Sequence, residues 1–311
     1  MKSIELSVPG KVFLGGEYLA LTGGTALLAG IEPRFRMLVE ETSLEQKNPF
    51  HENSPAGKLW LKYQKQLAGY RVRFIDPFEG KGGFGGSTAE FVLLFSFLNF
   101  IKSKSLDAQT EIDVHNMLNE YRTLAATVGY KPSGSDLIAQ FRGGLTLFSR
   151  EHGKIQNYAW LFSDLGLFVA KTNLKLKTHD HLANLKNFDS SGLAEAMNDV
   201  HISLESYQSE KLIAALNLFA GHLKTLGFVC QETRDLLEQL NHPGICVKKG
   251  CGAMGADVVL VIYKKSLTAG NEIKNQIEKL GLQIIATEKD LSPGLQVVNT
   301  SEVSHDKEVQ I

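Results

Sequence analysis

The chain has 311 residues, of which 43% are hydrophobic, and its 33 Lys and Arg nearly balance its 34 Asp and Glu. This length exceeds what one hydrophobic core usually serves, so we expect two domains. The near-neutral balance argues against a nucleic-acid partner, because proteins that bind duplexes usually carry a strongly basic face.

The sequence also disfavours membrane and secreted proteins. No run reaches the roughly 18 apolar residues that a membrane helix needs, and the apolar run over 91–101 stops at Lys102. Residues 1–8 lack the uninterrupted apolar stretch of a signal peptide. The 3 cysteines are odd in number and have no CxxC spacing, which argues against a disulfide framework or a zinc site. We expect a soluble, cytoplasmic protein without a membrane partner.

The first 150 residues predict β-structure followed by mixed helices and strands. Expected strands are 4–8, 12–14, 25–28, 34–40, 71–75 and 145–148, with a loop over 42–57 and helices over 58–67, 88–101 and 111–128. The helix over 88–101 is apolar nearly all round, so we expect it to be buried.

The remaining residues give a clearer pattern. Expected elements are a strand over 165–171, helices within 178–240, a strand over 258–263, a helix over 266–280 and a strand over 282–286. The last three form a strand-helix-strand unit, which favours an α+β layer with helices on one face. We therefore place two domains at 1–155 and 156–311.

Three glycine-rich segments are spread along almost the whole chain. They are 9–18 (PGKVFLGGEY), 82–88 (GGFGGST) and 249–257 (KGCGAMGAD). Glycine has no Cβ, so each segment can bring backbone amides close to a ligand. Together they suggest one phosphate-handling site assembled from distant parts of the chain.

The middle segment leads directly into an apolar helix. A glycine-rich loop at a helix N-terminus binds anions through oriented N–H groups and the helix dipole. Ser87 and Thr88 stand where a hydroxyl can cap the helix or reach a phosphate-bound Mg²⁺. A tight turn with a serine cap is the structural alternative. The segment has neither the Gly-Lys-Ser/Thr of a Walker A loop nor the GxGxxG order of a dinucleotide site.

Asp136 and Lys11 are the candidate catalytic residues. Asp136 follows the constrained turn Pro132-Ser133-Gly134-Ser135 at an expected helix start, where it could orient or deprotonate an acceptor hydroxyl. A helix cap is its alternative role. Lys11 could pair with Asp136 or steady a transferring phosphoryl group; the alternative is a solvated surface lysine.

Two further groups are weaker candidates. Glu17, beside Tyr18, could touch a nucleotide or buttress the first segment. His179-Asp180-His181 could ligate a metal, but no further ligand has helpful spacing, and a polar loop is the alternative.

Taken together and in this order, the three segments resemble the GHMP kinases, which include galactokinase and the homoserine, mevalonate and phosphomevalonate kinases. Residues 9–11 look like the N-terminal motif of that family, 83–89 like its GLGSS motif, and 250–257 like its C-terminal glycine motif. The segment from Pro132 to Asp136, followed by Gly143-Gly144, is similar to the catalytic-aspartate segment of mevalonate kinases.

The resemblance implies a two-domain α+β GHMP kinase fold. The N-terminal, ATP-binding domain would be like ribosomal protein S5 domain 2, and the C-terminal domain would be ferredoxin-like. The cofactors would be ATP and Mg²⁺, the partner a small-molecule substrate, and a homodimer is possible.

The resemblance also implies roles for single residues. ATP phosphates would lie along 83–88, at Gly83, Gly85, Gly86, Ser87 and Thr88. Ser87 would stand near Mg²⁺, while Asp136 and Lys11 would act on the acceptor hydroxyl. Substrate would be contacted by Glu17, Ser133, Gly252 and Ala253.

Three departures from the family pattern bear on the metal and the substrate. Gly86 replaces the first serine of the GLGSS pair. The metal carboxylate of mevalonate kinases would match Ala125, and Glu120 is the nearest acidic residue. Glu17 is followed by Tyr18, as in phosphomevalonate kinases, where mevalonate kinases typically carry His.

The expected function is therefore ATP-dependent phosphorylation of a small acceptor in isoprenoid precursor synthesis, with mevalonate and phosphomevalonate equally placed. A homoserine or sugar kinase, or a catalytically silent ligand-binding paralogue, are the alternatives. Arg34, Arg36, Arg71, Arg73 and Lys131 could meet a substrate anion, and the sequence does not choose among them.

Overall fold

The structure, a computed structural model, describes residues 3–80, 82–103, 112–127, 131–172, 188–252, 255, 257–266 and 268–299. The chain divides into two compact units. Unit 1 comprises Met1–Gly10, Pro33–Gly143 and Pro293–Ile311, and unit 2 comprises Lys11–Glu32 and Gly144–Ser292. These units are interleaved in the sequence, whereas we expected two continuous domains, 1–155 and 156–311. That domain assignment stays a prediction.

Two long strands contribute residues to both units. They are β1 (Ser3–Gly15) and β2 (Thr25–Glu41). In unit 1, β1 pairs antiparallel with β10 (Gln296–Asn299), and the C-terminal part of β2 pairs antiparallel with β3 (Tyr70–Ile75). The strand expected over 71–75 is thereby confirmed.

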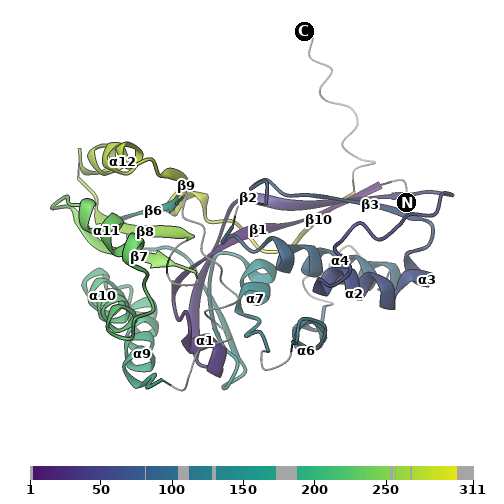
Figure 1. The fold of residues 1–311 in the computed structure, drawn as a ribbon, viewed down its shortest axis with the longest axis horizontal. Coiled ribbons are helices and arrows are strands. Elements are labelled where there is room, and N and C mark those ends of the chain that lie inside the picture. The colour runs from purple at the N-terminus through teal and green to yellow at the C-terminus, as the bar shows by residue number, and fades with distance from the viewer. Residues whose placement is uncertain are drawn as a thin grey trace, which may run out of the picture. The chain divides into compact units, whose positions relative to one another are not determined.

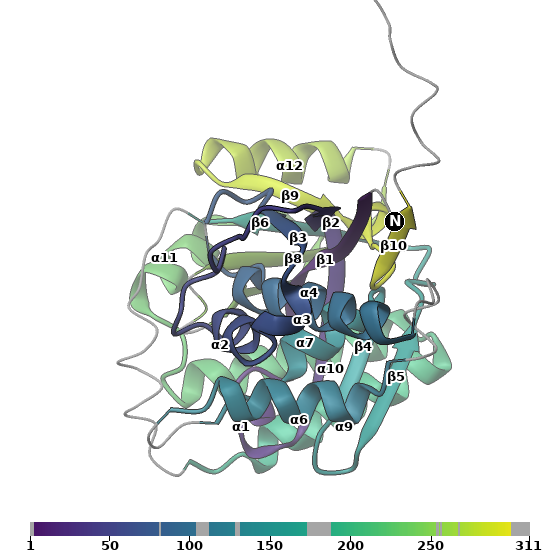
Figure 2. The ribbon, with the colours of Figure 1, turned by 90° about the vertical axis from the view of Figure 1, so that its right-hand side faces the viewer.

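The helices of unit 1 pack around one apolar helix, α4. They are α2 (Pro55–Lys62), α3 (Gln64–Leu67), α4 (Gly86–Ser103), α6 (Val114–Leu124) and α7 (Ser135–Arg142). Helix α4 contacts α2, α6 and α7, and Figure 2 shows it among them. Its residues 91–98 are all buried, which confirms the burial expected from its unbroken apolar pattern.

One buried amide joins three distant segments of unit 1. The Gln140 side chain, on α7, is 0% exposed. Its Nε2 donates to the carbonyl oxygen of Pro9, at 3.1 Å, and to that of Gly85, at 3.2 Å. Because a buried carbonyl requires a donor, this side chain fixes the first and second glycine-rich segments against α7.

Unit 2 begins with a short helix and a three-stranded antiparallel arrangement. Helix α1 (Leu19–Thr22) precedes β2, whose N-terminal part pairs with β4 (Leu145–Ser149), and β4 pairs with β5 (Lys154–Tyr158).

A second, four-stranded sheet follows in unit 2. Its order is β7-β8-β6-β9, every pair is antiparallel, and the strands are β6 (Leu165–Lys171), β7 (Ile245–Cys251), β8 (Val258–Lys264) and β9 (Gln283–Thr287). In chain order this is 2-3-1-4, the order of the split β-α-β, ferredoxin-like motif. The α+β class and the ferredoxin-like part are confirmed.

Helices cover the second sheet. They are α9 (Ser191–Ser206), α10 (Ser209–Thr225), α11 (Gln231–Gln239) and α12 (Ala269–Lys279). Residues of α11 and α12 join one core cluster with β6 and β8. Figure 1 shows α9 and α10 on the opposite side from α12, where α10 contacts β7. We expected the helices to lie on one face of this sheet. The expectation is right for α11 and α12 and wrong for α9 and α10, which lie on the other face.

Several boundaries differ from those expected. Strand β1 runs through Pro9-Gly10, and β2 runs through Gly30 and Pro33, where the sequence suggested turns. Strands β5, β7 and β10 were not expected, because their polar residues mask the alternation that predicts a strand. Within the described residues, no helix is long and apolar enough to cross a membrane.

Replacing Gln140 with Leu tests the bridge between the segments. The variant keeps the volume but leaves the Pro9 carbonyl without this donor, so we expect the free energy of unfolding to fall by about 1–3 kcal/mol. Urea denaturation measures this change. Gln276→Leu is the matched control, because the Gln276 amide also donates to two carbonyls, but only at 3.3 and 3.4 Å in exposed bonds. Equal losses in the two variants would contradict the bridge.

Candidate active site

The second glycine-rich segment forms a tight loop at the N-terminus of α4. Gly83 and Gly85 have φ values of 87° and 90°, in the left-handed region that favours glycine. Helix α4 begins at Gly86, and the Ala89 amide donates to the Gly85 oxygen at 2.9 Å. The loop therefore presents backbone amides at the start of an 18-residue helix, the arrangement that binds anions.

The two hydroxyl residues of this loop differ in exposure. Ser87 is exposed, whereas Thr88 is buried, with 5% of its surface accessible. Of the two, Ser87 is the hydroxyl available to a ligand.

A pocket of about 380 Å³ opens beside this loop, within unit 1. The glycine-rich loop forms one wall. Aromatic side chains form another, and the rings of Phe78 and Phe84 stack with their centroids 4.3 Å apart. Asp76 holds the adjoining turn by accepting from the amides of Phe78, at 2.8 Å, and Gly80, at 2.7 Å. The pocket thus joins a flat apolar surface to a polar, anion-binding loop.

Glu90 lines the same pocket, and sequence reasoning missed it. It lies three residues after Ser87 on α4, so both side chains project from the same side of the helix. Burial, with a smaller contribution from the Asp76 carboxylate, raises the pKa of Glu90 to about 7. The available signal was a single charged residue in the otherwise uncharged stretch 88–101.

The turn before α7 fixes the position of Asp136. Gly134 has a φ of 84°, and a Cβ there would lie 2.1 Å from Leu118 Cδ1, so only glycine fits. The Ser133 hydroxyl accepts from the Ser135 amide at 3.2 Å. Asp136 is half-buried in the first turn of α7. Ser133 is thus engaged locally, beside the candidate catalytic carboxylate.

Glu120, considered above as a metal ligand, is engaged elsewhere. Its carboxylate pairs with Lys62 of α2, with Nζ and Oε1 2.6 Å apart. Ala125, at the matching position, ends α6. Among the described residues, no group of three His, Cys, Asp or Glu is arranged to hold a metal ion. The geometry gives Glu120 no support as a ligand.

Lys11, in unit 2, is buried, with 7% of its surface accessible. Its amine lies 5.2 Å from the centroid of the Phe13 ring. Burial raises the pKa of Asp257, and the charge of Lys11 opposes this shift. Lys11 is therefore no solvated surface lysine.

A buried ion pair joins the first and third glycine-rich segments within unit 2. Lys249 Nζ lies 2.5 Å from Glu17 Oε1, and the two residues are 2% and 5% exposed. Burial alone would lower the pKa of Lys249, but the neighbouring Cys251 sulfur and Glu17 carboxylate raise it by more. Burial raises the pKa of the Cys251 thiol to about 11. The lysine is thus charged and the thiol neutral.

The pair leaves one carboxylate oxygen available. Within the described part of the chain, Glu17 Oε2 is buried and has no hydrogen-bond partner. The next residue, Tyr18, has a φ of 63° and stacks on Phe228 at a centroid distance of 4.1 Å. Glu17 is thus held firmly while keeping an unused acceptor. Lys249 was missed in the sequence because it looks like any strand lysine.

The third segment is described only in part. Gly252 has a φ of 84°, and a Cβ there would lie 2.6 Å from Asp257 Oδ2. The predicted substrate residue Ala253 lies outside the described residues, as does His179-Asp180-His181.

The arginines considered as anion ligands are partly accounted for. Arg34 donates from Nε to the Ser7 hydroxyl at 3.0 Å and from Nη1 to the Pro293 carbonyl at 2.6 Å. Arg36 pairs with Glu5 at 3.7 Å. Arg34 therefore has a structural role at the start of β10.

The predicted residues form two groups, one in each unit. Unit 1 contains the glycine loop, Ser133 and Asp136, with Gln140 joining the loop to α7. Unit 2 contains Lys11, Glu17 and Gly252.

Comparisons with known proteins concern the whole chain and its fold. No profile of a known protein family matches the sequence. The chain is 24% identical over 301 residues to the mevalonate kinase of Aeropyrum pernix, covering 85% of this chain and 90% of that protein.

Solved structures share the fold. Streptococcus pneumoniae phosphomevalonate kinase has a TM-score of 0.75 at 19% identity, covering 92% of this chain and 99% of that one. The same enzyme in complex with phosphomevalonate and AMPPNP has a TM-score of 0.74 at 19% identity, covering 91% and 98% of the two chains. A homoserine kinase from Cytophaga hutchinsonii has a TM-score of 0.68 at 13% identity, covering 96% and 98%.

Breaking the buried ion pair should destabilise the protein strongly. Lys249→Met leaves the Glu17 charge buried and uncompensated, so we expect a loss of about 3–5 kcal/mol in the free energy of unfolding. The double variant Glu17→Gln/Lys249→Met should recover part of it. Lys264→Met, which removes exposed ion pairs, is the control and should lose less than about 1 kcal/mol. Urea denaturation measures these free energies of unfolding. If the loss in the double variant equals the sum of the losses in Glu17→Gln and Lys249→Met, the two residues are not coupled.

The raised pKa of Glu90 makes stability depend on pH. Above pH 4.5 the unfolded chain loses this proton, whereas the folded chain keeps it up to about pH 7, so stability falls across this window as pH rises. Glu90→Gln abolishes the fall. After allowance for the partial exposure of Glu90, we expect the free energy of unfolding of the variant, relative to that of wild type, to rise by about 1–2 kcal/mol between pH 4.5 and pH 7.5.

Urea denaturation in metal-free buffer at both pH values tests this expectation. Glu195→Gln, a change at an exposed position of α9, serves as control. Parallel pH curves for wild type and Glu90→Gln would contradict it.

Proposed function

We propose that this chain is a kinase of the GHMP type, to which its fold and sequence are similar, and that it transfers the γ-phosphoryl group of ATP to a small acceptor. The observation that carries the proposal is the link made by Gln140. The same side chain bonds the anion-binding loop, at Gly85, and belongs to the helix that carries Asp136. A phosphate site and a candidate base are thereby held on one frame.

The loop supplies the binding of the nucleotide. Amides along 83–88 and the N-terminus of α4 would hold the ATP phosphates at Gly83, Gly85, Gly86 and Ser87. The adjoining aromatic pocket offers a flat apolar surface to the base. Support comes from the phosphomevalonate kinase of similar fold, which was solved with AMPPNP.

Phosphoryl transfer requires mainly positioning and charge stabilisation. With mevalonate, Asp136 would accept the proton of the attacking hydroxyl, as the new O–P bond forms and the bond to ADP breaks. With phosphomevalonate, a phosphate oxygen would attack, and Asp136 would accept a proton only from a singly protonated phosphate. Lys11 would stabilise the charge on the transferring group. Glu17, with its unused Oε2, would accept a hydrogen bond from the acceptor, and Ser133, Gly252 and Ala253 would complete the substrate contacts.

A magnesium ion would be held by the Ser87 hydroxyl and the Glu90 carboxylate. Both line one pocket, and oxygen ligands of this kind suit Mg²⁺. The raised pKa of Glu90 fits a carboxylate whose charge a bound cation would compensate. When bound, Mg²⁺ neutralises charge on the phosphates.

The proposed acceptor is mevalonate or phosphomevalonate. Mevalonate is supported by the sequence relative, a mevalonate kinase. Phosphomevalonate is supported by the Glu17-Tyr18 pair and by the structure of similar fold solved with that compound. Homoserine and sugars are the alternative acceptors.

A silent paralogue that binds ligand without turnover is the second candidate. Ala125 stands at the expected carboxylate position, and Glu120 is paired with Lys62. These two observations favour it.

Release of ADP with Mg²⁺ and four acceptors tests the proposal: mevalonate, phosphomevalonate, homoserine and galactose. We expect turnover with one of the first two. Asp136→Asn should lower kcat by roughly 10²–10⁴, and Lys11→Met should also lower it. Asp113→Asn is the control, because Asp113 only caps α6, and it should leave kcat unchanged.

The remaining outcomes select among the alternatives. Turnover only with galactose would reject an isoprenoid acceptor. An ATP analogue that binds without turnover of any acceptor would favour the silent paralogue.

A further inference from the structure

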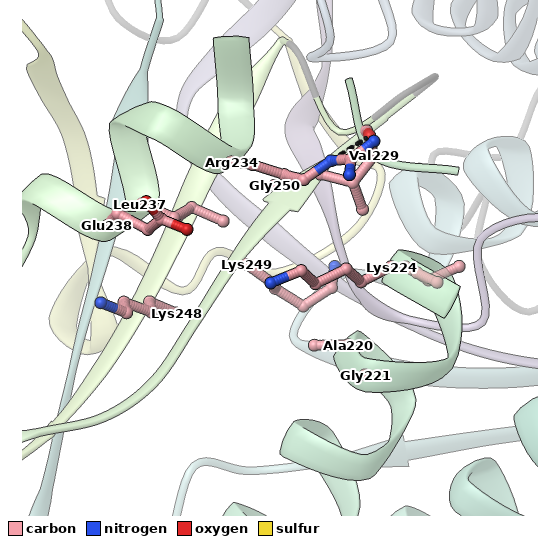
Figure 3. A pocket seen from close by; sticks show the side chains of 11 residues that line it. Ala220, Gly221, Lys224, Val229, Arg234, Leu237, Glu238, Lys248, Lys249 and Gly250 are labelled. Carbon is pink, nitrogen blue, oxygen red and sulfur yellow. Dashed lines mark hydrogen bonds between the residues drawn. The ribbon is translucent and has the colours of Figure 1, made fainter. Parts of the chain in front are cut away.

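A second cavity lies wholly within unit 2, at the edge strand β7. It measures about 220 Å³, and α10, α11 and β7 form its walls (Figure 3). Leu223, Val229 and Leu237 give it an apolar interior. Figure 3 shows Ala220 and Gly221 on the α10 side and Leu237 and Glu238 on the α11 side. None of these residues belongs to the glycine loop.

Cationic side chains with unused donors surround this cavity. Arg234 donates only its Nε, to the Val229 carbonyl at 3.0 Å, so within the described residues the Nη nitrogens have no partner. Lys248 donates to the Leu240 carbonyl at 2.7 Å and meets no described carboxylate. Exposed Lys224 makes no hydrogen bond or ion pair within the part of the chain described. Exposed Glu238 is the opposing carboxylate.

The fourth cation, Lys249, is already neutralised by Glu17. Three cations therefore remain against one carboxylate around a largely apolar space. Unused guanidinium nitrogens match the oxygens of carboxylates and phosphates. The cavity thus offers an apolar interior and cationic donors, the two features that bind an amphiphilic anion.

Size limits the apolar part of such a ligand. A cavity of about 150 Å³ admits a benzene ring, so 220 Å³ accommodates an aliphatic group of about five or six carbons.

We propose that this cavity binds a small amphiphilic anion, a carboxylate or phosphate monoester with a short aliphatic group. The anionic end contacts Arg234, and the aliphatic group lies against Leu223, Val229 and Leu237. The inference uses unit 2 alone and does not depend on the proposed kinase activity.

The cavity adjoins the residues of unit 2 that we propose to contact the acceptor, through strand β7. Lys249 and Gly250 line it, and the same Lys249 amine bonds Glu17. A bound anion therefore touches the strand that positions Glu17. This contact gives the ligand a route to alter how Glu17 is held.

Isothermal titration of the full chain with 3-methylbutyl phosphate tests the site. We expect saturable binding, with inorganic phosphate and 3-methylbutanol each much weaker, because each offers only half of the recognised chemistry. Arg234→Gln should weaken binding about tenfold, the effect of one charge-assisted hydrogen bond. Lys211→Gln, at an exposed position of α10 away from the cavity, should bind as wild type.

One more variant and a competition experiment complete the test. Lys224→Gln changes an exposed, unpaired side chain, so it should fold normally and weaken binding more than Lys211→Gln. Unchanged affinity in both Arg234→Gln and Lys224→Gln overturns the proposal. Displacement of the probe by saturating AMPPNP also overturns it, since the anion would then occupy the glycine loop. Failure of ADP release, by contrast, would count against the kinase and leave this site standing.

Discussion

The arrangement of unit 1 depends on one buried amide, that of Gln140. Its two hydrogen bonds reach residues 131 and 55 positions away in the sequence. Apolar packing is non-directional, whereas these two bonds fix the positions of the Pro9 and Gly85 carbonyls relative to α7. Since Asp136 lies one turn before Gln140, the same contact that orients the glycine loop also orients the candidate base. The loop and the carboxylate are therefore parts of one rigid assembly.

Unit 2 uses a charge pair where unit 1 uses an amide. Lys249 and Glu17 are 232 residues apart, and burying them demands that each neutralise the other. A well-packed apolar pair would hold the strands equally well, so stability alone does not explain the ions. The second oxygen of Glu17, which has no hydrogen-bond partner among the described residues, suits the proposed contact with the acceptor.

The sequence predicted what local patterns determine. The nearly unbroken apolar run of 88–101 identified α4 and its burial, and the strand-helix-strand pattern at 258–286 identified β8, α12 and β9, because propensity and packing agree there. It failed where a long-range contact decides. Pro9-Gly10 suggested a turn, yet β1 continues through it. The decisive partners of Gln140 and Lys249 lie far away in the chain, so no local pattern distinguishes these two residues.

The proposed metal site also could not be predicted from the sequence alone. Matching the family pattern by position led to Ala125 and then to Glu120, whose carboxylate is paired with Lys62. The fold instead brings Glu90 into the pocket of the glycine loop, from the helix that the loop begins. Burying an unpaired carboxylate among phenylalanines is unfavourable. If no cation bound there, replacing the Glu90 carboxylate by a neutral group would stabilise the protein. Such a carboxylate fits the proposed role of Glu90 as a metal ligand on the same helix as Ser87.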